Sequence, residues 1–162
     1  MTITVRKYRE ADVSAMNKIW NRVVQDGVAF PQTEFLDLES GRKFFAEQSF
    51  TGVAENESGE VVGLYILHPN NIGRCGHICN ASYAVDAELR GCGIGESLVR
   101  HCIQMGKELG FGVLQFNAVV STNAPALHLY EKIGFTRLGV IPKGFRLDSG
   151  EYADIIPHYI SL

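Results

Sequence analysis

Three glycines in one short segment, Arg90–Gly95 (R-G-C-G-I-G), form the feature of this sequence with the clearest chemical meaning. The segment lies between a strand-like run and a stretch with helical periodicity, so we expect it to turn directly into a helix. Glycines let the backbone turn sharply and approach a ligand closely. The first turn of a helix has unpaired N–H groups beside the positive end of the helix dipole. The loop, with the fixed charge of Arg90, is therefore predicted to bind an anion such as a pyrophosphate.

Two common nucleotide-binding motifs do not fit this segment. A Walker loop needs Lys followed by Ser or Thr after its last glycine, whereas Gly95 is followed by Glu96 and Ser97. A dinucleotide-binding fold needs G-x-G-x-x-G early in a parallel β-α-β unit, and that spacing is broken here. A plain glycine-rich turn is the remaining alternative to an anion site.

Three asparagines and a tyrosine are the other candidates for chemistry. Asn80 and Asn117 stand inside otherwise apolar strand-like runs, and Asn123 opens a helical segment whose inner face includes Tyr130. A buried amide without a hydrogen bond costs about 1–3 kcal/mol, so each amide is either a satisfied structural group or a ligand contact. Tyr130 is likewise either a core aromatic residue or a proton donor.

A metal site is not favoured. Cys75 and Cys79, with His77 between them and His68 nearby, have a spacing that zinc could accept, but no second cysteine pair follows. We expect ordinary thiols and no metal, as is usual in the reducing cytoplasm.

The elements that position these residues follow from the periodicity. Alternating or continuous apolar runs predict strands, and apolar residues spaced by three and four predict helices. The predicted strands are Ile3–Tyr8, Thr51–Glu55, Val61–Leu67, His77–Val85, Val113–Val120, Thr136–Ile141 and Ala153–Ile160, and the predicted helices follow Asp12, Asp37, Gly93 and Asn123. Residues Pro142–Glu151 are expected to connect the last two strands. This order predicts an α/β (α+β) fold, in which an antiparallel meander precedes a β-α-β crossover in one mixed sheet.

Length and composition limit the class of protein. The 162 residues fit a single domain, residues 1–162, and 46% hydrophobic with 20% charged residues is ordinary globular usage. A net charge of −3 argues against a nucleic-acid partner. The apolar runs are too short to span a membrane, and the N-terminus lacks the apolar region of a signal peptide. We therefore expect a cytoplasmic protein without a membrane partner, and a homodimer is left open.

Two segments together resemble the signatures of the GNAT superfamily of N-acetyltransferases. Arg90-x-x-Gly93-x-Gly95 resembles the acetyl-CoA motif Q/R-x-x-G-x-G/A, and Asn123–Phe135 resembles N-x-x-A-x-x-L-Y-E-K-x-G-F. The predicted element order is similar to that of the family from end to end. The resemblance implies a mixed, mostly antiparallel central sheet with helices on both faces, splayed apart where acetyl-CoA binds.

The resemblance also implies roles for individual residues. The loop would hold the pyrophosphate, Tyr83–Val85 would pair with the pantetheine arm, and Tyr130 would protonate the departing thiolate. The implied acetyl-CoA-binding residues are Tyr83, Ala84, Val85, Arg90, Gly91, Cys92, Gly93, Ile94, Gly95, Glu96, Asn123 and Tyr130. Asn117 and Asn123 join Tyr130 as the implied catalytic residues.

The acceptor is less defined. Residues His77–Ala81 and the pair Asn117 and Asn123 also resemble the fungal acetyltransferases of proline analogues within the superfamily. That similarity implies a small-molecule, amino-acid-like amine held partly by Asn80, and we expect Phe30 to line its pocket. Transfer would be by direct attack of the amine on the thioester. A protein or peptide N-acetyltransferase and a non-catalytic acyl-CoA-binding module are left open, and Glu55, His68 and His77 are the candidate general bases.

Overall fold

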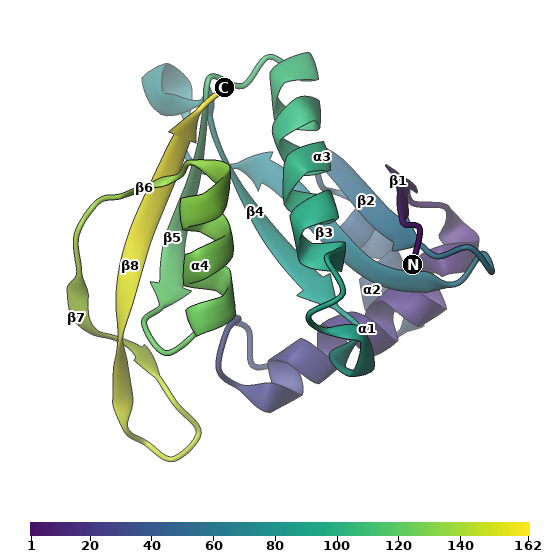
Figure 1. Ribbon diagram of the computed structural model, residues 1–162, viewed down its shortest axis with the longest axis horizontal. Coiled ribbons are helices and arrows are strands. Elements are labelled where there is room, and N and C mark those ends of the chain that lie inside the picture. The colour runs from purple at the N-terminus through teal and green to yellow at the C-terminus, as the bar shows by residue number, and fades with distance from the viewer.

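The computed structural model describes all residues, 1–162, and contains one eight-stranded sheet with the order β1-β2-β3-β4-β5-β8-β6, in which β7 pairs with β8 (Figure 1). The strands are β1 (Thr4–Lys7), β2 (Phe50–Glu55), β3 (Val61–Pro69), β4 (Ile78–Val85), β5 (Val113–Val120), β6 (Thr136–Arg137), β7 (Ile141–Arg146) and β8 (Tyr152–Ser161). The α-helices are α1 (Val13–Asp26), α2 (Leu38–Ala46), α3 (Ile94–Glu108) and α4 (Ala124–Ile133), and η1 (Glu10–Asp12), η2 (Gly73–Cys75) and η3 (Ala87–Leu89) are short 3-10 turns.

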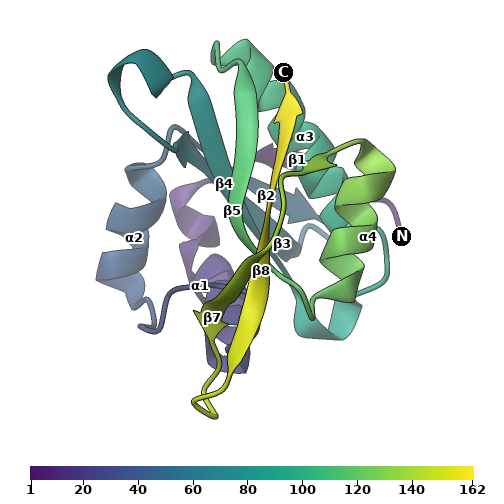
Figure 2. The ribbon, with the colours of Figure 1, turned by 90° about the vertical axis from the view of Figure 1, so that its left-hand side faces the viewer.

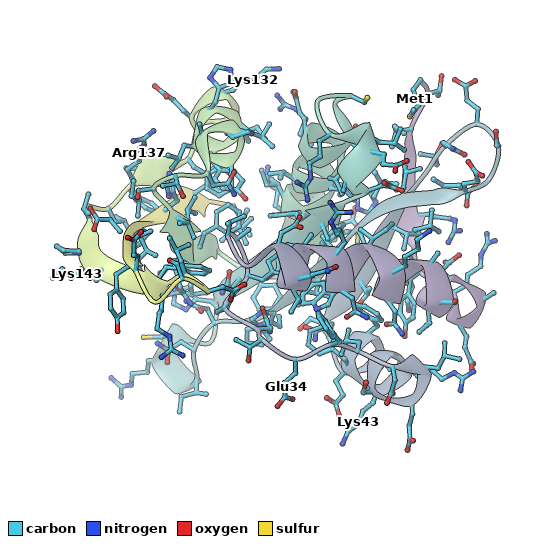
Figure 3. The ribbon with its side chains drawn as sticks, turned by 90° about the horizontal axis from the view of Figure 1, so that it is seen from below. Met1, Glu34, Lys43, Lys132, Arg137 and Lys143 are labelled. Atoms are coloured by element: carbon cyan, nitrogen blue, oxygen red, sulfur yellow. The ribbon has the colours of Figure 1, made fainter.

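Helices cover both faces of this sheet. Helices α1 and α2 lie on one face and α3 and α4 on the other (Figure 2). In Figure 3, Lys43 of α2 and Lys132 of α4 lie at opposite edges of the molecule and mark these two outer layers. Each face buries its own apolar cluster, one around Trp20 and Phe45 and the other around Leu98. No helix has the length and apolar character needed to span a membrane.

The centre of the sheet is splayed. Strands β4 and β5 are parallel neighbours, but their register contains only the pairs Ile78–Val113 and Cys79–Leu114. From there the two strands separate, as Figure 1 shows, and the connection from α1 to α2 passes beyond their divergent ends. Every other pairing in the sheet is antiparallel. The predicted fold class, including the splay, is therefore confirmed.

The helices beside the splay begin where the sequence predicts. Helix α3 follows Gly93, and α4 follows Asn123, whose Oδ1 accepts a hydrogen bond from the Ala126 N–H at 3.3 Å. Such a bond satisfies one of the donors that every helix N-terminus leaves free. Pro125 in the first turn costs nothing, because its missing N–H would have no partner there.

The C-terminal segment differs from its prediction. The strand expected over Thr136–Ile141 is interrupted at 138–140, and its last residue belongs to a separate strand, β7. The expected connection after Ile141 thus begins as a strand that pairs with β8. Pro142 and Gly144 favour a loop by their residue type. They are tolerated in β7 because it is an edge strand that pairs only with β8 and forms few ladder hydrogen bonds.

Candidate active site

A cavity of about 190 Å³ lies where β4 and β5 separate. Its walls come from the two strands, from the connection after α1 and from the first two turns of α4. The lining residues are Ala29, Phe30, Pro31, Asn80, Ala81, Ser82, Tyr83, Phe116, Asn117, Ala118, Val119, Val120, Asn123, Ala126 and Tyr130. Six of the predicted site residues are thus brought together by segments far apart in the chain.

Tyr130 projects from the inner face of α4 into this cavity. Its ring packs against Phe116, Phe135 and His158, with centroid distances of 4.6, 5.4 and 5.7 Å. Its hydroxyl forms no hydrogen bond within the protein, and burial raises the pKa of Tyr130 above the ordinary value. The packing fixes the ring while the O–H remains free to donate a proton or a hydrogen bond.

The glycine-rich loop has the conformation that a close ligand contact requires. Gly91 and Gly93 both have φ of +81°, a left-handed conformation that side chains disfavour, and the space beyond their Cα atoms is open. Cys92 between them is exposed, whereas Ile94 anchors the start of α3 in the core. At the junction between α3 and α4, a Cβ built on Gly95 would lie 3.6 Å from the side chain of Leu129. The first turn of α3 therefore has free backbone N–H donors behind a loop with open space in front of it.

The charged residues at this loop are held by ion pairs. Arg90 pairs with Asp26 in the last turn of α1, at 3.3 Å, and Asp26 also binds Arg22 at 3.0 Å. Because Asp26 shares its charge between two guanidinium groups, Arg90 remains a net positive group next to the loop.

Glu96, which the resemblance implies to be a cofactor contact, has a side chain that binds two cations. Its carboxylate pairs with Lys132 of α4 at 2.7 Å and with Arg100 of α3 at 2.9 Å. Lys132 and then Arg100 lower the pKa of Glu96. The residue therefore fastens α3 to α4 along one side of the cavity.

The predicted arm-binding segment alternates between the two faces of the sheet. The side chains of Tyr83 and Val85 pack on the α3 face, whereas Ala84 is buried against α1. Tyr83 lines the cavity, and its hydroxyl is buried without a hydrogen-bond partner. By the alternation of the β3–β4 ladder, the backbone groups of Ala84 face β3, whereas those of Tyr83 and Val85 face the unpaired edge of β4.

The expectation that Asn80 and Asn117 are buried amides is wrong. Asn80 is half-buried, and Asn117 is exposed on the face of α1 and α2, because the splay removes the neighbouring strand that would cover them. Asn117 forms reciprocal amide hydrogen bonds with Asn70, at 2.7 and 3.1 Å, and accepts another from Gln115. The amide nitrogens of Asn80 and Asn123 have no hydrogen-bond partner within the protein.

Phe30 lines the cavity from the connection after α1. It is buried and packs against Trp20 with tilted rings at a centroid distance of 4.4 Å, which fixes the connection after α1 to the core. Two polar residues of this region were not predicted: Ser82, which lines the cavity, and Asn70, which holds Asn117. The period of two along a strand places Ser82 on the same face as Asn80 and could have identified it.

The cysteines form neither a disulfide nor a metal cluster. All four are free, with Cys75 exposed and Cys79 buried, and no three His, Cys, Asp or Glu side chains come together anywhere in the structure.

Comparison with known proteins identifies the family. Residues 15–135 match the model of the Acetyltransferase (GNAT) family. N-acetyltransferase aca1 of Schizosaccharomyces pombe is 37% identical over 95 residues, which are 58% of this chain but only 46% of aca1. Peptidyl-lysine N-acetyltransferase YjaB of Escherichia coli is 30% identical over 140 residues, which are 86% of each protein.

The fold is shared with solved structures of the same family. A GCN5-related N-acetyltransferase from Kribbella flavida is 31% identical and superposes with a TM-score of 0.90 over 99% of this chain and 98% of that one. The splayed sheet, the glycine loop before α3 and the tyrosine on α4 thus occur together in a chain whose sequence and fold both match these enzymes. The chain belongs to the GNAT family of acetyltransferases.

Proposed function

We propose that this enzyme transfers the acetyl group of acetyl-CoA to the amine of a small, amino-acid-like acceptor by direct attack of the amine on the thioester. The observation that carries the proposal is the cavity between β4 and β5, which has the unpaired Tyr130 hydroxyl at one wall and Phe30 with Asn80 at the other. In this proposal the whole chain, residues 1–162, is one catalytic domain. We propose the cytoplasm as its location, since its four cysteines are free thiols.

Acetyl-CoA fits the residues on the α3 side of the splay. The open space and backbone conformation at Gly91 and Gly93 suit a pyrophosphate bound by N–H groups at the start of α3. The edge of β4 at Tyr83–Val85 has no partner in β5, so its backbone groups can pair with an extended arm. A GNAT acetyltransferase from Sinorhizobium meliloti, solved in complex with AcCoA, has the same fold. When bound, the cofactor supplies an acetyl group activated as a thioester.

Tyr130 is proposed as the proton donor to the departing sulfur. Its ring is fixed by aromatic neighbours and its hydroxyl has no competing partner, so the proton is free for transfer. The Oδ1 of Asn123 accepts the capping hydrogen bond of α4. Its amide nitrogen is therefore free to donate to the thioester or to the pantetheine arm. Asn117 is proposed to act from the opposite strand, where Asn70 orients its amide.

The acceptor is proposed to lie between Asn80 and Phe30. The unpartnered Asn80 amide nitrogen can donate to a carboxylate or carbonyl oxygen, and the Phe30 ring can cover an apolar side chain. Relatives named as L-amino acid acyltransferases, MnaT and AaaT of Escherichia coli, support an acceptor of this class.

Two alternatives are tested by the same experiment. The name of YjaB favours a peptidyl-lysine acceptor, and a module that binds acyl-CoA without turnover would release no thiol. The enzyme is incubated with acetyl-CoA and imino acids, primary amino acids, polyamines or short peptides, and free thiol is measured. We expect thiol release with imino or amino acids. Thiol release with peptides alone would contradict the proposed amino-acid-like acceptor. If none of the amines caused thiol release, the proposed acetyltransferase activity would be contradicted.

A further inference from the structure

The turn between β7 and β8 touches the end of α1. Asp148 is at the tip of this turn, and a Cβ built on Gly27 would lie 2.8 Å from its Oδ2 and 3.1 Å from its Cγ. The carboxylate therefore lies directly against the glycine, and a larger residue at position 27 would fit only if the turn moved. Figure 1 shows the turn and the end of α1 below the divergent ends of β4 and β5.

Each side of this contact is held in place independently. On the α1 side, the Gly27 N–H binds the Val24 carbonyl at 3.2 Å, and a φ of +65° gives the left-handed conformation that ends the helix. On the other side, the N–H groups of Leu147 and Gly150 bind the carbonyls of Glu151 and Leu147 at 2.8 and 2.9 Å. The helix end and the turn therefore meet as two ordered surfaces.

The Gly27–Asp148 contact joins two walls of the cavity. The connection that begins at Gly27 supplies Phe30 to the lining. On the other side, Leu147 packs against the small apolar cluster that contains Val120, which is also a lining residue. The acceptor side of the cavity is therefore enclosed, where β4 and β5 diverge, by the connection after α1 and the β7–β8 turn.

This enclosure makes the acceptor side a blind pocket rather than an open groove. A lysine inside a polypeptide has chain on both sides of its Cα, so its amine needs a surface that is open at both ends of the site. A free amino acid has no such continuation. The cavity volume of about 190 Å³ is below the roughly 300–1,000 Å³ of typical small-molecule pockets, so a compact acceptor fits it better than a polypeptide.

We propose that the Gly27–Asp148 contact determines acceptor specificity, because it admits compact amino-acid-like amines and excludes the amine of a lysine within a polypeptide. This inference rests on the proposed function and deepens it. The exclusion is steric, since a polypeptide crossing this end of the site would occupy the space of the turn. A clash of this kind rejects one ligand without requiring any contact with the favoured one.

The first test changes the turn. The probes are the small amine with the highest thiol release and a short peptide with blocked ends, whose one amine is an internal lysine. We expect wild type to prefer the small amine by at least about a hundredfold in kcat/KM, and Asp148→Ala to lower this preference by about tenfold through faster reaction of the peptide. Asp148→Asn is the matched control, because it keeps the size of the side chain without its charge and should keep the wild-type preference.

The second test changes the helix end. Gly27→Ala places a Cβ against the Asp148 carboxylate, so it should displace the turn and lower the same preference. Gly110→Ala is the matched control, since Gly110 follows α3 with a φ of +87° and a Cβ there would meet nothing within 4 Å. It reproduces the backbone strain without the clash, and we expect the wild-type preference. Circular dichroism checks that both variants are folded.

Three results would overturn the proposal. One is a wild-type enzyme that acetylates the lysine peptide as readily as the small amine. Another is a wild-type preference in both Asp148→Ala and Gly27→Ala. The third is an equal loss of preference in Asp148→Asn and Asp148→Ala, because the carboxylate would then act by its charge and not by its bulk. Absence of thiol release with every amine is a different result, which contradicts the proposed function itself.

Discussion

Tyr130 combines a fixed ring with an unpaired hydroxyl, and replacing only that hydroxyl tests its role. Tyr130→Phe keeps the contacts with Phe116, Phe135 and His158 but removes the proton donor. We expect kcat to fall by about a hundredfold or more while the Kd of acetyl-CoA stays close to wild type. Steady-state kinetics and calorimetry measure the two quantities. The control is Tyr152→Phe, at an exposed tyrosine outside the cavity, and wild-type kcat in Tyr130→Phe would assign the proton to another group.

The pH dependence of the same residue has a definite sign. Burial raises the pKa of Tyr130, so its phenol stays protonated at pH values where a free tyrosine begins to ionise. At saturating concentrations of both substrates we expect kcat to show no fall between about pH 8 and 10. A stopped assay across this range measures it, and a decline centred near pH 9 that is absent from a stability control would contradict the assignment.

Asn80 tests the acceptor side of the cavity. Its amide nitrogen has no partner within the protein, whereas its Oδ1 accepts a hydrogen bond from the Ala81 N–H at 2.8 Å, so Asn80→Ala removes the proposed ligand contact and also leaves that backbone donor without its partner. We expect the KM of the amine to rise by about tenfold and the KM of acetyl-CoA to change much less. The second constant is the internal control, and equal effects on both would indicate a structural role.

At the scale of an element, the glycine loop owes its conformation to two residues with positive φ. Gly93→Val should weaken acetyl-CoA binding by at least about tenfold, because a branched side chain would occupy the open space over the loop and disfavour its backbone conformation. Gly59→Val is a matched control, since Gly59 has φ of +80° and open space in the β2–β3 hairpin, away from the cavity. Calorimetry on the folded variants measures their affinity for acetyl-CoA. If Gly93→Val and Gly59→Val bind acetyl-CoA equally well, the loop is excluded from the site.

Elements defined by strong local signals were predictable from the sequence. The apolar run Val113–Val120 coincides with β5, and Asn123 and Gly134 bound α4 as their capping preferences require. Strand β7 was missed because its pairing with β8 depends on a contact between distant segments, and no local pattern records that contact. Burial of Asn117 was predicted wrongly for the same reason, since the splay that exposes it is a property of two strands together.

The molecule has three apolar clusters, and the two largest lie on opposite faces of the sheet. Leu98 of α3 is fully buried in one of them, so Leu98→Ala should lower the free energy of unfolding by about 2–5 kcal/mol. Leu138→Ala at a largely exposed position should change it by less than about 0.5 kcal/mol. Urea unfolding measures both, and equal effects would mean that the buried cluster does not dominate stability.

The two kinds of free edge in this sheet have opposite consequences for assembly. At the outer edge, β7 resists the addition of a foreign strand, because Pro142 has no N–H and the N–H of Lys143 already binds Asp154 at 3.0 Å. The inner edge of β4, beyond Cys79, has no such blocks but lies between β4 and β5 in the middle of the sheet, with helices on both faces (Figure 2). The protein can therefore keep an unpaired strand edge for an extended ligand without offering that edge at the outside of the sheet, where strands of other chains add during aggregation.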